Sequence, residues 1–306
     1  MPFTLKKFSV TKGKTIQIAL LQDLTLSPKI SSRMLSRGRI FNSNKVPYKI
    51  SQVIEEDYIY MAVFEGHTRG LNPLITFTDF AIFDKPSNLM IHPISKSTEY
   101  SLLDEIRYHF GDKANQAHRI DAETSGLVLV GRNNKTTNAL ATMFEKKEYK
   151  KAYLAIVKGK LEKEITIDKN LKKEGKAIGV RMATCSKEEG KESITNVKPL
   201  KYNKDKDLTL IEVNPITGRQ HQIRIHLNSI GHTILGDPIY GVCDEVAEEY
   251  LNKTISKQTR IKHSGSYRLW LQANYLEFKY KGAIYKIYSK NKDIYQEFDK
   301  EFILKK

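Results

Sequence analysis

The spacing of apolar residues predicts two short helices near the start of the chain. Residues 14–25 repeat apolar side chains at the one-face spacing of a helix. The SPKIS segment at 27–31 is expected to form a loop, because Ser followed by Pro favours a turn. Ser31 or Ser32 would then cap a second short helix that ends at Gly38.

An extended region follows these helices. Asn42 to Lys45 are expected to form a tight turn between two short extended pieces, because Asn tolerates a positive φ. Residues 58–64, YIYMAVF, alternate with period two and predict a strand. Residues 66–73 are dense in Gly and Pro and predict a linker. The first 65 residues are therefore expected to form a small helix–helix–hairpin module.

The pattern changes from Leu74 onward. Helices are expected at 98–111, ending at Gly111, and at 136–148. Strands are expected at 75–86, 125–132, 150–159, 208–215, 220–227 and 269–280. Strands mixed with a few helices, without regular βαβ alternation, predict an α+β fold with a large mixed sheet.

Composition places the chain among soluble globular proteins. It has 306 residues, of which 40% are hydrophobic and 28% charged. No apolar stretch approaches the roughly 18 residues that a membrane helix needs, and the N-terminus lacks the apolar core of a secretory signal. The two cysteines, Cys185 and Cys243, fit neither a disulfide framework nor a zinc motif. A cytoplasmic location and no bound metal are the simplest expectations.

Positive charge is concentrated at the N-terminus. The formal net charge of the chain is +16, and residues 1–50 hold ten basic residues and one acid. Arg33, Arg37 and Arg39 crowd one short segment, and the guanidinium group suits forked contacts with phosphate. A solvated basic surface is the alternative explanation. The crowding of arginines favours a surface that binds a polyanion such as RNA.

The segment AHRIDAETSGLVLVGRN at 117–133 displays one carboxylate at the start of a buried strand. Thr124 and Ser125 can bond the local backbone and fix a tight turn, and Gly126 allows a sharp change of direction. This arrangement holds Asp121 in a rigid position. An Asp that only stabilises its own loop has the same appearance, so this segment alone does not establish a catalytic role.

The segment GRQHQIRIHL at 218–227 is expected to be a strand with one polar face. Gln220, Gln222, Arg224 and His226 would share that face, and Arg224 would be buried between two isoleucines. A buried arginine needs a carboxylate, and Asp121 is the candidate partner, which the pair would hold in its ionised form. His221 and His226 are five residues apart, a poor spacing for metal ligands.

Four segments together resemble the RluA-type RNA pseudouridine synthases. They are DKPSNLMIHP at 84–93, HRIDAETSGLVLV within 117–133, KKAYLAIVKG at 150–159, and GRQHQIRIHL followed by GHTILGDPIYG at 231–241. Their order is that of the family, and several motifs in order are far more specific than any one. The resemblance implies a large mixed, mainly antiparallel sheet with flanking helices at 74–306. The first 65 residues resemble a divergent S4-type RNA-binding module, with 66–73 as the linker.

The family assigns roles to residues that match its motifs. Asp121 would be the nucleophile, attacking either the sugar or the uracil ring, and Arg224 would pair with it. Tyr153 would stack on the flipped uracil and assist removal of the proton from C5. Arg119 would fill the space that the target base leaves in the RNA, and His118 and Thr124 would also contact substrate. The resemblance implies an isomerase without cofactor that acts as a monomer on structured RNA, ribosomal RNA in preference to transfer RNA.

Two alternatives stay open at this point. The first is a catalytically inactive RNA-binding or ribosome-assembly factor on the same fold, which the joint presence of Asp121, Tyr153 and Arg224 disfavours. The second is a hydrolase that pairs Asp121 with Glu123, which needs a raised pKa on one acid.

Three residues depart from the family pattern. Asn88 replaces a glycine, Gln272 stands where histidine is frequent, and Asn44 stands where the S4-type hairpin has glycine. Since Asn tolerates a left-handed φ, the turn at Asn88 is expected to survive.

Overall fold

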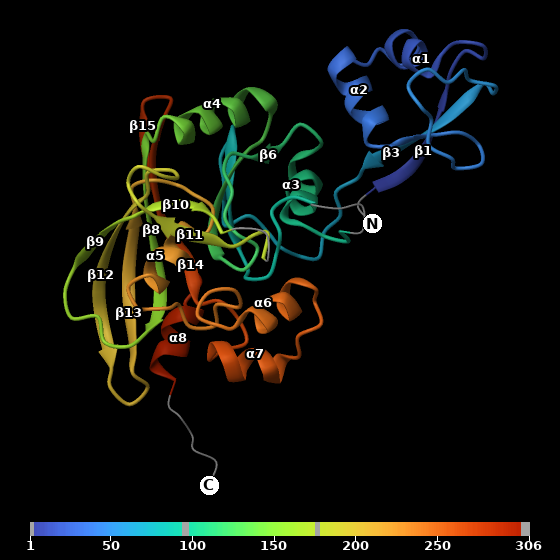
Figure 1. The fold of residues 1–306 in the computed structure, drawn as a ribbon. Helices are drawn as coiled ribbons and strands as arrows, with labels where there is room; N and C mark the ends of the chain where they lie inside the picture. The colour runs from blue at the N-terminus through green and yellow to red at the C-terminus, as the bar shows by residue number, and fades with distance from the viewer. Residues whose placement is uncertain (1–2, 94–97, 175–177, 301–306) are drawn as a thin grey trace. The chain divides into compact units, whose positions relative to one another are not determined.

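The computed structural model describes residues 3–93, 98–174 and 178–300, drawn in Figure 1. Contacts divide the chain into two compact units. The first comprises residues 1–69 and 93–112, and the second comprises residues 70–92 and 113–306. The expected boundaries at residues 65 and 73 remain predictions about which segments fold independently, and so does the S4-type character of the N-terminal part.

Both predicted helices form in the first unit, as α1 (Ile16–Gln22) and α2 (Pro28–Ser36). The expected cap of α2 at Ser31 or Ser32 is wrong, because the helix begins four residues earlier. Ser27 is its N-cap and accepts a hydrogen bond from the backbone N–H of Ile30 at 3.4 Å. Pro28 occupies the first turn, where its fixed φ suits a helix and no N–H is needed. The predicted loop at 27–31 is therefore the first turn of α2.

A three-stranded antiparallel sheet packs with these helices. Its strands are β1 (Phe3–Ser9), β2 (Ile40–Phe41) and β3 (Tyr58–Phe64), in the order β1-β3-β2. The predicted turn is confirmed by the hydrogen bond from the Lys45 N–H to the Asn42 carbonyl, although Lys45 rather than an asparagine takes the positive φ.

The helix predicted at 98–111 forms in the first unit as α3 (Leu102–Phe110), which starts four residues late and ends at Gly111 as expected. A capping box of Ser101 and Asp104 fixes its start. The backbone N–H of Arg69 donates to the Glu105 carboxylate at 2.6 Å, so part of the Gly-rich segment is bonded to α3.

The second unit is built on a ten-stranded sheet, which confirms the predicted α+β fold. Its main path runs β4-β5-β7-β14-β8-β13-β12-β9, with β15 paired to β14 and β6 to β7. Within the described residues β7 and β14 are the parallel pair, and the other pairings are antiparallel. A separate hairpin joins β10 and β11. The strands are β4 (Ile75–Thr76), β5 (Phe80–Lys85), β6 (Asn115–Gln116), β7 (Ser125–Gly131), β8 (Tyr149–Lys158), β9 (Ile165–Asp168), β10 (Asn170–Lys173), β11 (Met182–Cys185), β12 (Ile194–Asn203), β13 (Leu208–Pro215), β14 (Leu271–Tyr280) and β15 (Ala283–Tyr288).

Helices cover both faces of this sheet (Figure 1). The helices of this unit are α4 (Asn134–Glu145), α5 (Gln222–Asn228), α6 (Asp244–Leu251), α7 (Lys257–Ser264) and α8 (Asp293–Asp299). Successive residues of β8 face opposite sides of the sheet, as the pleat requires. Ala155 and Val157 pack in the cluster that contains the α5 residue Leu227, whereas Leu154 packs in the cluster with Phe298 of α8. The central strands are therefore buried on both sides.

The strand predicted at 220–227 is wrong, because most of this segment forms α5. Ile223 and Leu227, four residues apart, pack on the sheet from one side of the helix. Gln222 and His226, also four apart, both bond to Thr195 of β12. The alternation of polar and apolar residues imitated a strand because the polar residues of α5, Gln222, Arg224 and His226, are buried too and have polar partners inside the protein.

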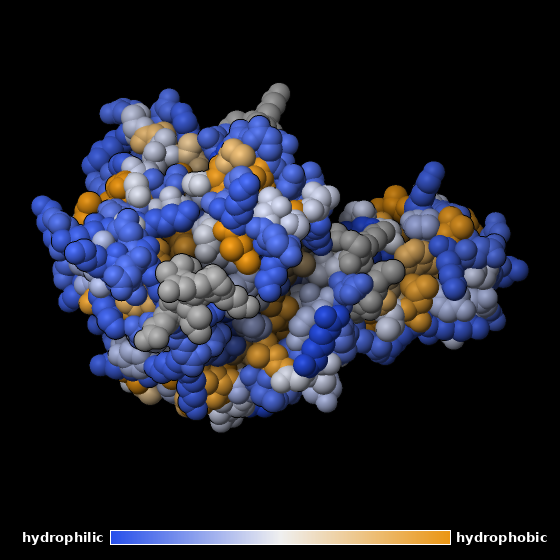
Figure 2. Space-filling model, turned by 90° about the horizontal axis from the view of Figure 1, so that it is seen from below, coloured by the Kyte–Doolittle hydropathy of each residue, from blue (hydrophilic) through white to orange (hydrophobic). Residues whose placement is uncertain are grey.

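Hydrophilic residues cover much of the face shown in Figure 2, with hydrophobic residues in scattered groups. Within the described residues, no helix combines the length and the apolar character needed to cross a membrane.

Candidate active site

A cavity of about 580 Å³ collects most residues to which the sequence assigns chemistry. Its walls come from the segment before β7, from β8, from the end of α4 and from the loop before α5. Asp121, Tyr153 and Arg224 all line it, although they are far apart in the sequence. The volume lies within the roughly 300–1,000 Å³ typical of sites for small organic ligands.

The loop that carries Asp121 is clamped from the segment at 84–93. The Lys85 ammonium donates to the carbonyl oxygen of Ala122 at 2.9 Å. The Ser87 hydroxyl donates to the carbonyl oxygen of Glu123 at 2.6 Å. These two bonds hold the backbone on the C-terminal side of Asp121, so the carboxylate projects from a fixed support.

Lys85 is fully buried, and sequence analysis assigned it no role. Burial lowers the pKa of Lys85 to about 7, against the opposing effect of the Asp121 and Glu123 carboxylates. The lysine followed by proline in this motif was the available signal. Asn88 adopts a φ of 64°, so the prediction that asparagine would preserve the turn is confirmed.

Glu123 is committed to structural contacts. Its carboxylate accepts from Arg260 at 2.8 Å, from the Tyr250 hydroxyl and from the backbone N–H of Leu269. The side chain is buried. With both oxygens bonded, Glu123 is unavailable as a second acid beside Asp121, which removes the basis for the hydrolase alternative.

Arg224 is buried as predicted, with 2% of its surface exposed, but its main partner is Asp237. Nε and Nη2 donate to the two Asp237 oxygens at 2.8 and 2.7 Å, a bidentate pair. Nη1 lies 3.6 Å from Oδ2 of Asp121. The expected ion pair with Asp121 thus forms at this longer distance, and Asp237, which was not expected, is the closer partner. Arg224 bridges a buried carboxylate and the cavity carboxylate.

Asp237 was not predicted as a partner of Arg224. Residues 220–227 were expected to form a strand, and Asp121 was the expected partner. It lies in the GDPIYG part of the motif at 231–241, which was the available signal. Burial alone would raise the pKa of Asp237, but Arg224 and the backbone N–H groups of Ile239 and Tyr240 hold it below its usual range. Burial alone would lower the pKa of Arg224, and Asp237 keeps it above the usual value.

His221 sits beside Asp121 in a left-handed backbone conformation, with φ 54°, as the N-cap of α5. Nε2 lies 3.8 Å from Oδ2 of Asp121, and Nδ1 is 3.1 Å from the Tyr240 hydroxyl. Burial and the adjacent Arg224 charge lower the pKa of His221 to about 4. A neutral imidazole therefore borders Asp121 at neutral pH, and the unusual φ places it there.

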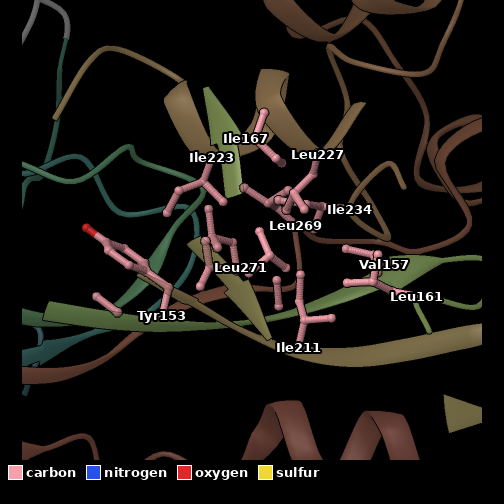
Figure 3. Close-up of a cluster of buried hydrophobic side chains, with 14 residues drawn as sticks. Tyr153, Val157, Leu161, Ile167, Ile211, Ile223, Leu227, Ile234, Leu269 and Leu271 are labelled. Atoms are coloured by element: carbon pink, nitrogen blue, oxygen red, sulfur yellow. The ribbon is translucent and has the colours of Figure 1, made fainter. Parts of the chain in front are cut away.

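Tyr153 lies at the edge of the hydrophobic cluster beneath the cavity. In Figure 3 its ring lies at one end of the labelled group, and its hydroxyl points away from the other side chains. Burial, with the Asp121 charge, raises the pKa of Tyr153. The ring is thus placed as a wall of the cavity and keeps its phenolic proton at neutral pH.

His118, Arg119 and Thr124 also line the cavity, in different ways. His118 stacks on Phe144, and its Nε2 accepts the Leu129 N–H at 3.0 Å. Arg119 is exposed, whereas Thr124 is buried. Contacts of these three residues with RNA remain predictions.

The predicted N-terminal arginines lie in the first unit. Arg33 and Arg37 are exposed, and the Arg39 guanidinium lies 4.2 Å from the ring centroid of Phe3. Burial, together with the charges of Arg37, Arg33 and Arg107, lowers the pKa of Arg39. Sequence analysis did not anticipate Arg107 of α3, which joins this cluster of like charges. Phosphate contacts by the cluster remain a prediction.

Gln272 is buried, and its amide donates to the Ser289 hydroxyl at 2.9 Å and to the Asn291 carbonyl at 3.0 Å. This departure from the family pattern thus has local partners away from the cavity lining. Among the described residues, no cluster of three or more His, Cys, Asp or Glu side chains has the arrangement of a metal site.

Solved structures identify the class of the fold. The human protein "RNA Pseudouridylate Synthase Domain Containing 1" superposes with a TM-score of 0.58 at 22% identity, covering 75% of this chain and 86% of its own. The human "RNA Pseudouridylate Synthase Domain Containing 4" gives 0.57 at 18% identity, covering 74% and 91%. The fold is that of pseudouridylate synthase domains.

Sequence comparisons place the chain in a family. The family model described as RNA pseudouridylate synthase matches residues 79–229. An uncharacterized RNA pseudouridine synthase of Helicobacter pylori J99 is 37% identical, covering 98% of this chain and 100% of its own. Ribosomal large subunit pseudouridine synthase D of Zymomonas mobilis is 33% identical over 55% of each chain. The chain belongs to the RluA-type RNA pseudouridine synthases and is an isomerase.

The His118 contact predicts a pH-dependent stability. Burial, with the nearby Lys151 charge, lowers the pKa of His118 to about 3. Below pH 6.5 His118 binds a proton in the unfolded chain but not in the folded chain. The free energy of unfolding therefore falls as pH falls, by up to about 1.4 kcal/mol per pH unit. We expect the stability advantage of the wild type over His118→Gln to shrink between pH 7 and pH 4.5. Urea unfolding of both proteins across that range measures it, and a constant difference would contradict the assignment.

The Arg224 pairing predicts a strong energetic coupling with Asp237 and a weak one with Asp121. Arg224→Met should cost about 3–5 kcal/mol, because it strands a buried carboxylate. Adding Asp237→Asn should recover part of that loss. Adding Asp121→Asn should recover less than about 1 kcal/mol, because the Asp121 side chain is 33% exposed and 3.6 Å away. Two double-mutant cycles by denaturant unfolding compare these couplings, and equal couplings would refute the geometry.

Proposed function

We propose that this enzyme isomerises specific uridines of ribosomal RNA, with Asp121 as nucleophile. The observation that carries the proposal is the Asp121 carboxylate, partly exposed in the cavity and bordered by Arg224 and His221. Of the residues that line this cavity, Asp121 is the carboxylate that has both a fixed backbone support and a neighbouring guanidinium.

The relatives supply the argument for the ribosomal target. Proteins of Zymomonas mobilis, Nitrosomonas europaea and Haemophilus ducreyi that resemble this chain are named ribosomal large subunit pseudouridine synthase D. Transfer RNA is the competing target. The predicted cytoplasmic location belongs to the same proposal, and the free cysteines Cys185 and Cys243 suit a reducing compartment.

The chemistry can be completed by side chains of the chain. The C1′–N1 bond of the target nucleotide breaks, the ring turns, and a C1′–C5 bond forms. C5 then loses a proton and N1 gains one, so atoms and electrons balance without an oxidant or reductant. Asp121 assists by bonding either to the sugar or to the ring.

The remaining residues of the cavity hold the substrate. Tyr153 offers an aromatic wall on which the flipped uracil stacks. Because its pKa is raised, Tyr153 acts through its ring and its neutral hydroxyl rather than as a phenolate. Arg119 is exposed at the cavity lining, a suitable position from which to occupy the space that the target base leaves in the RNA.

The nucleophile is tested by Asp121→Asn. The variant should fold, because no short hydrogen bond to the Asp121 side chain is found among the residues that the structure describes. It should lose at least about 10³-fold in single-turnover rate, the scale seen for members of catalytic sets. Release of tritium from RNA labelled with [5-³H]uridine measures the rate. Asp168→Asn, which removes a surface carboxylate that pairs with Lys187, is the matched control and should keep the wild-type rate. Undiminished activity in folded Asp121→Asn would end the proposal.

The N-terminal arginines are tested by salt dependence. Replacing Arg33, Arg37 and Arg39 together with Gln should weaken RNA binding and reduce the log–log salt slope by about 0.7–0.9 for each phosphate that the variant no longer neutralises. The control replaces two lysines of the second unit, Lys160 and Lys198, each of which pairs with a glutamate of that same unit. Equal salt slopes for the wild type and the triple variant would mean that the arginines do not contact phosphates and have a structural role instead.

The target and the competing non-catalytic function are resolved by one experiment. Pseudouridines in ribosomal and transfer RNA are mapped by carbodiimide modification in cells with the gene, without it, and with the Asp121→Asn form. A site lost in both altered strains supports the proposal and identifies the uridine. If no site depends on Asp121, the chain acts as an RNA-binding factor.

A further inference from the structure

Lys151 lines the cavity, and the proposed mechanism gives it no role. It precedes Tyr153 by two residues on β8, so both side chains project from the same face of the sheet. Its Nζ lies 5.8 Å from the ring centroid of Tyr153 and 5.3 Å from that of Tyr149. All three residues line the cavity, and Lys151 is mostly buried.

The charge of Lys151 has no carboxylate partner in the part of the chain that the structure describes. Its contacts there are the two tyrosine rings. The adjacent Lys150 shows the contrast, because it lies on the opposite face, is 76% exposed and bonds to Glu277 at 2.9 Å. A largely buried ammonium without an acceptor is costly, and burial lowers the pKa of Lys151 to about 8. A bound ligand that supplies a hydrogen-bond acceptor would offset this cost.

The surroundings of Lys151 favour an acceptor that carries negative charge. A Cβ atom at Gly218 would lie 3.8 Å from its Nζ, so the amine faces the loop before α5. Besides the two tyrosines, the other charged or titratable groups that line the cavity are His118, Arg119, Asp121, Glu145, Lys147, Arg219, His221 and Arg224. Neither carboxylate forms an ion pair with Lys151 among the described contacts.

We propose that Lys151 donates a hydrogen bond to a carbonyl oxygen of the target uracil and stabilises the negative charge that this ring carries while it is detached from the sugar. The inference rests on the proposed function, because it requires the uracil to lie between Asp121 and Tyr153. When the C1′–N1 bond breaks, its electron pair remains on the ring and spreads over N1, O2 and O4. Formation of the C1′–C5 bond consumes that charge. Lys151 keeps its proton throughout.

The position of Lys151 suits this role better than the role of a proton acceptor. An acceptor must be neutral before it acts, and below pH 8 the ammonium form predominates. The two roles predict opposite responses to pH. A rate that depends on the ammonium falls as pH rises through about 8, whereas a rate that depends on the free amine rises over the same interval.

Three variants separate these possibilities. Lys151→Met removes the charge and keeps most of the stem, Lys151→Arg keeps a positive charge at every pH, and Lys150→Met is the matched control on the opposite face of β8. Each is measured with a [5-³H]uridine-labelled transcript that carries the mapped target uridine, under single-turnover conditions with saturating enzyme. RNA affinity and the thermal midpoint of each variant are measured in parallel.

We expect Lys151→Met to slow the saturated rate by about 10²–10³-fold, the scale for loss of one preorganised donor, with RNA affinity changed less than threefold. Lys150→Met should stay within twofold of wild type. The wild-type rate should fall between pH 7.5 and 9, and Lys151→Arg, although slower, should lose that fall. The Met variant should be no less stable than wild type, since it removes an unpaired charge.

Three results would overturn the inference. A wild-type rate for Lys151→Met removes the role altogether. A tenfold loss of RNA affinity at an unchanged saturated rate makes Lys151 a backbone-phosphate contact. A wild-type rate that rises through pH 8 makes it a base. Asp121→Asn, assayed alongside, keeps the two proposals apart, because an inactive Asp121→Asn with a fully active Lys151→Met refutes this inference alone.

Discussion

The bidentate pair between Arg224 and Asp237 is the contact on which the cavity geometry depends. It joins α5 to the loop at 236–241, and it satisfies two charges that could not otherwise be buried. Asp237 also accepts the backbone N–H groups of Ile239 and Tyr240, which fixes the loop and the Tyr240 ring. With Nε and Nη2 committed to Asp237, Nη1 is the edge that faces Asp121. The cavity carboxylate thus borders a guanidinium that is already held in place.

The pleat of β8 places a reactive surface directly beside the core. Ala155 and Val157 belong to the hydrophobic cluster beneath α5, and Tyr153 lies at the edge of that cluster with its hydroxyl directed outward. One step further along the same face, Lys151 lines the cavity. One face of β8, followed from Val157 back to Lys151, therefore supplies core packing, then an aromatic wall and then a cation, because alternate residues share one face.

Burial shifts the pKa of three groups that line the cavity or support the loop of Asp121. Burial lowers the pKa values of Lys85, Lys151 and His221 to about 7, 8 and 4. Lys85 uses its donors on backbone carbonyl oxygens and so supports the loop, and His221 stays neutral beside the carboxylate. Lys151 finds no carboxylate among the residues that the structure describes. The same desolvation thus has three different consequences, which depend on the partners that each side chain finds.

Local sequence determined the α+β class, most strands and the segments that meet at the cavity, because period-two alternation and ordered motifs are properties of short windows. It also determined that Arg224 would be buried and that Asn88 would accept a left-handed φ. The tertiary structure decided the rest. Most of the 220–227 segment became the helix α5, whose buried polar residues bond to Thr195 of β12 and to Asp237 rather than facing a cleft along one side of a strand. Asp237 and Lys85 find their partners on other segments of the chain, and contacts of that kind are set by packing rather than by any local spacing.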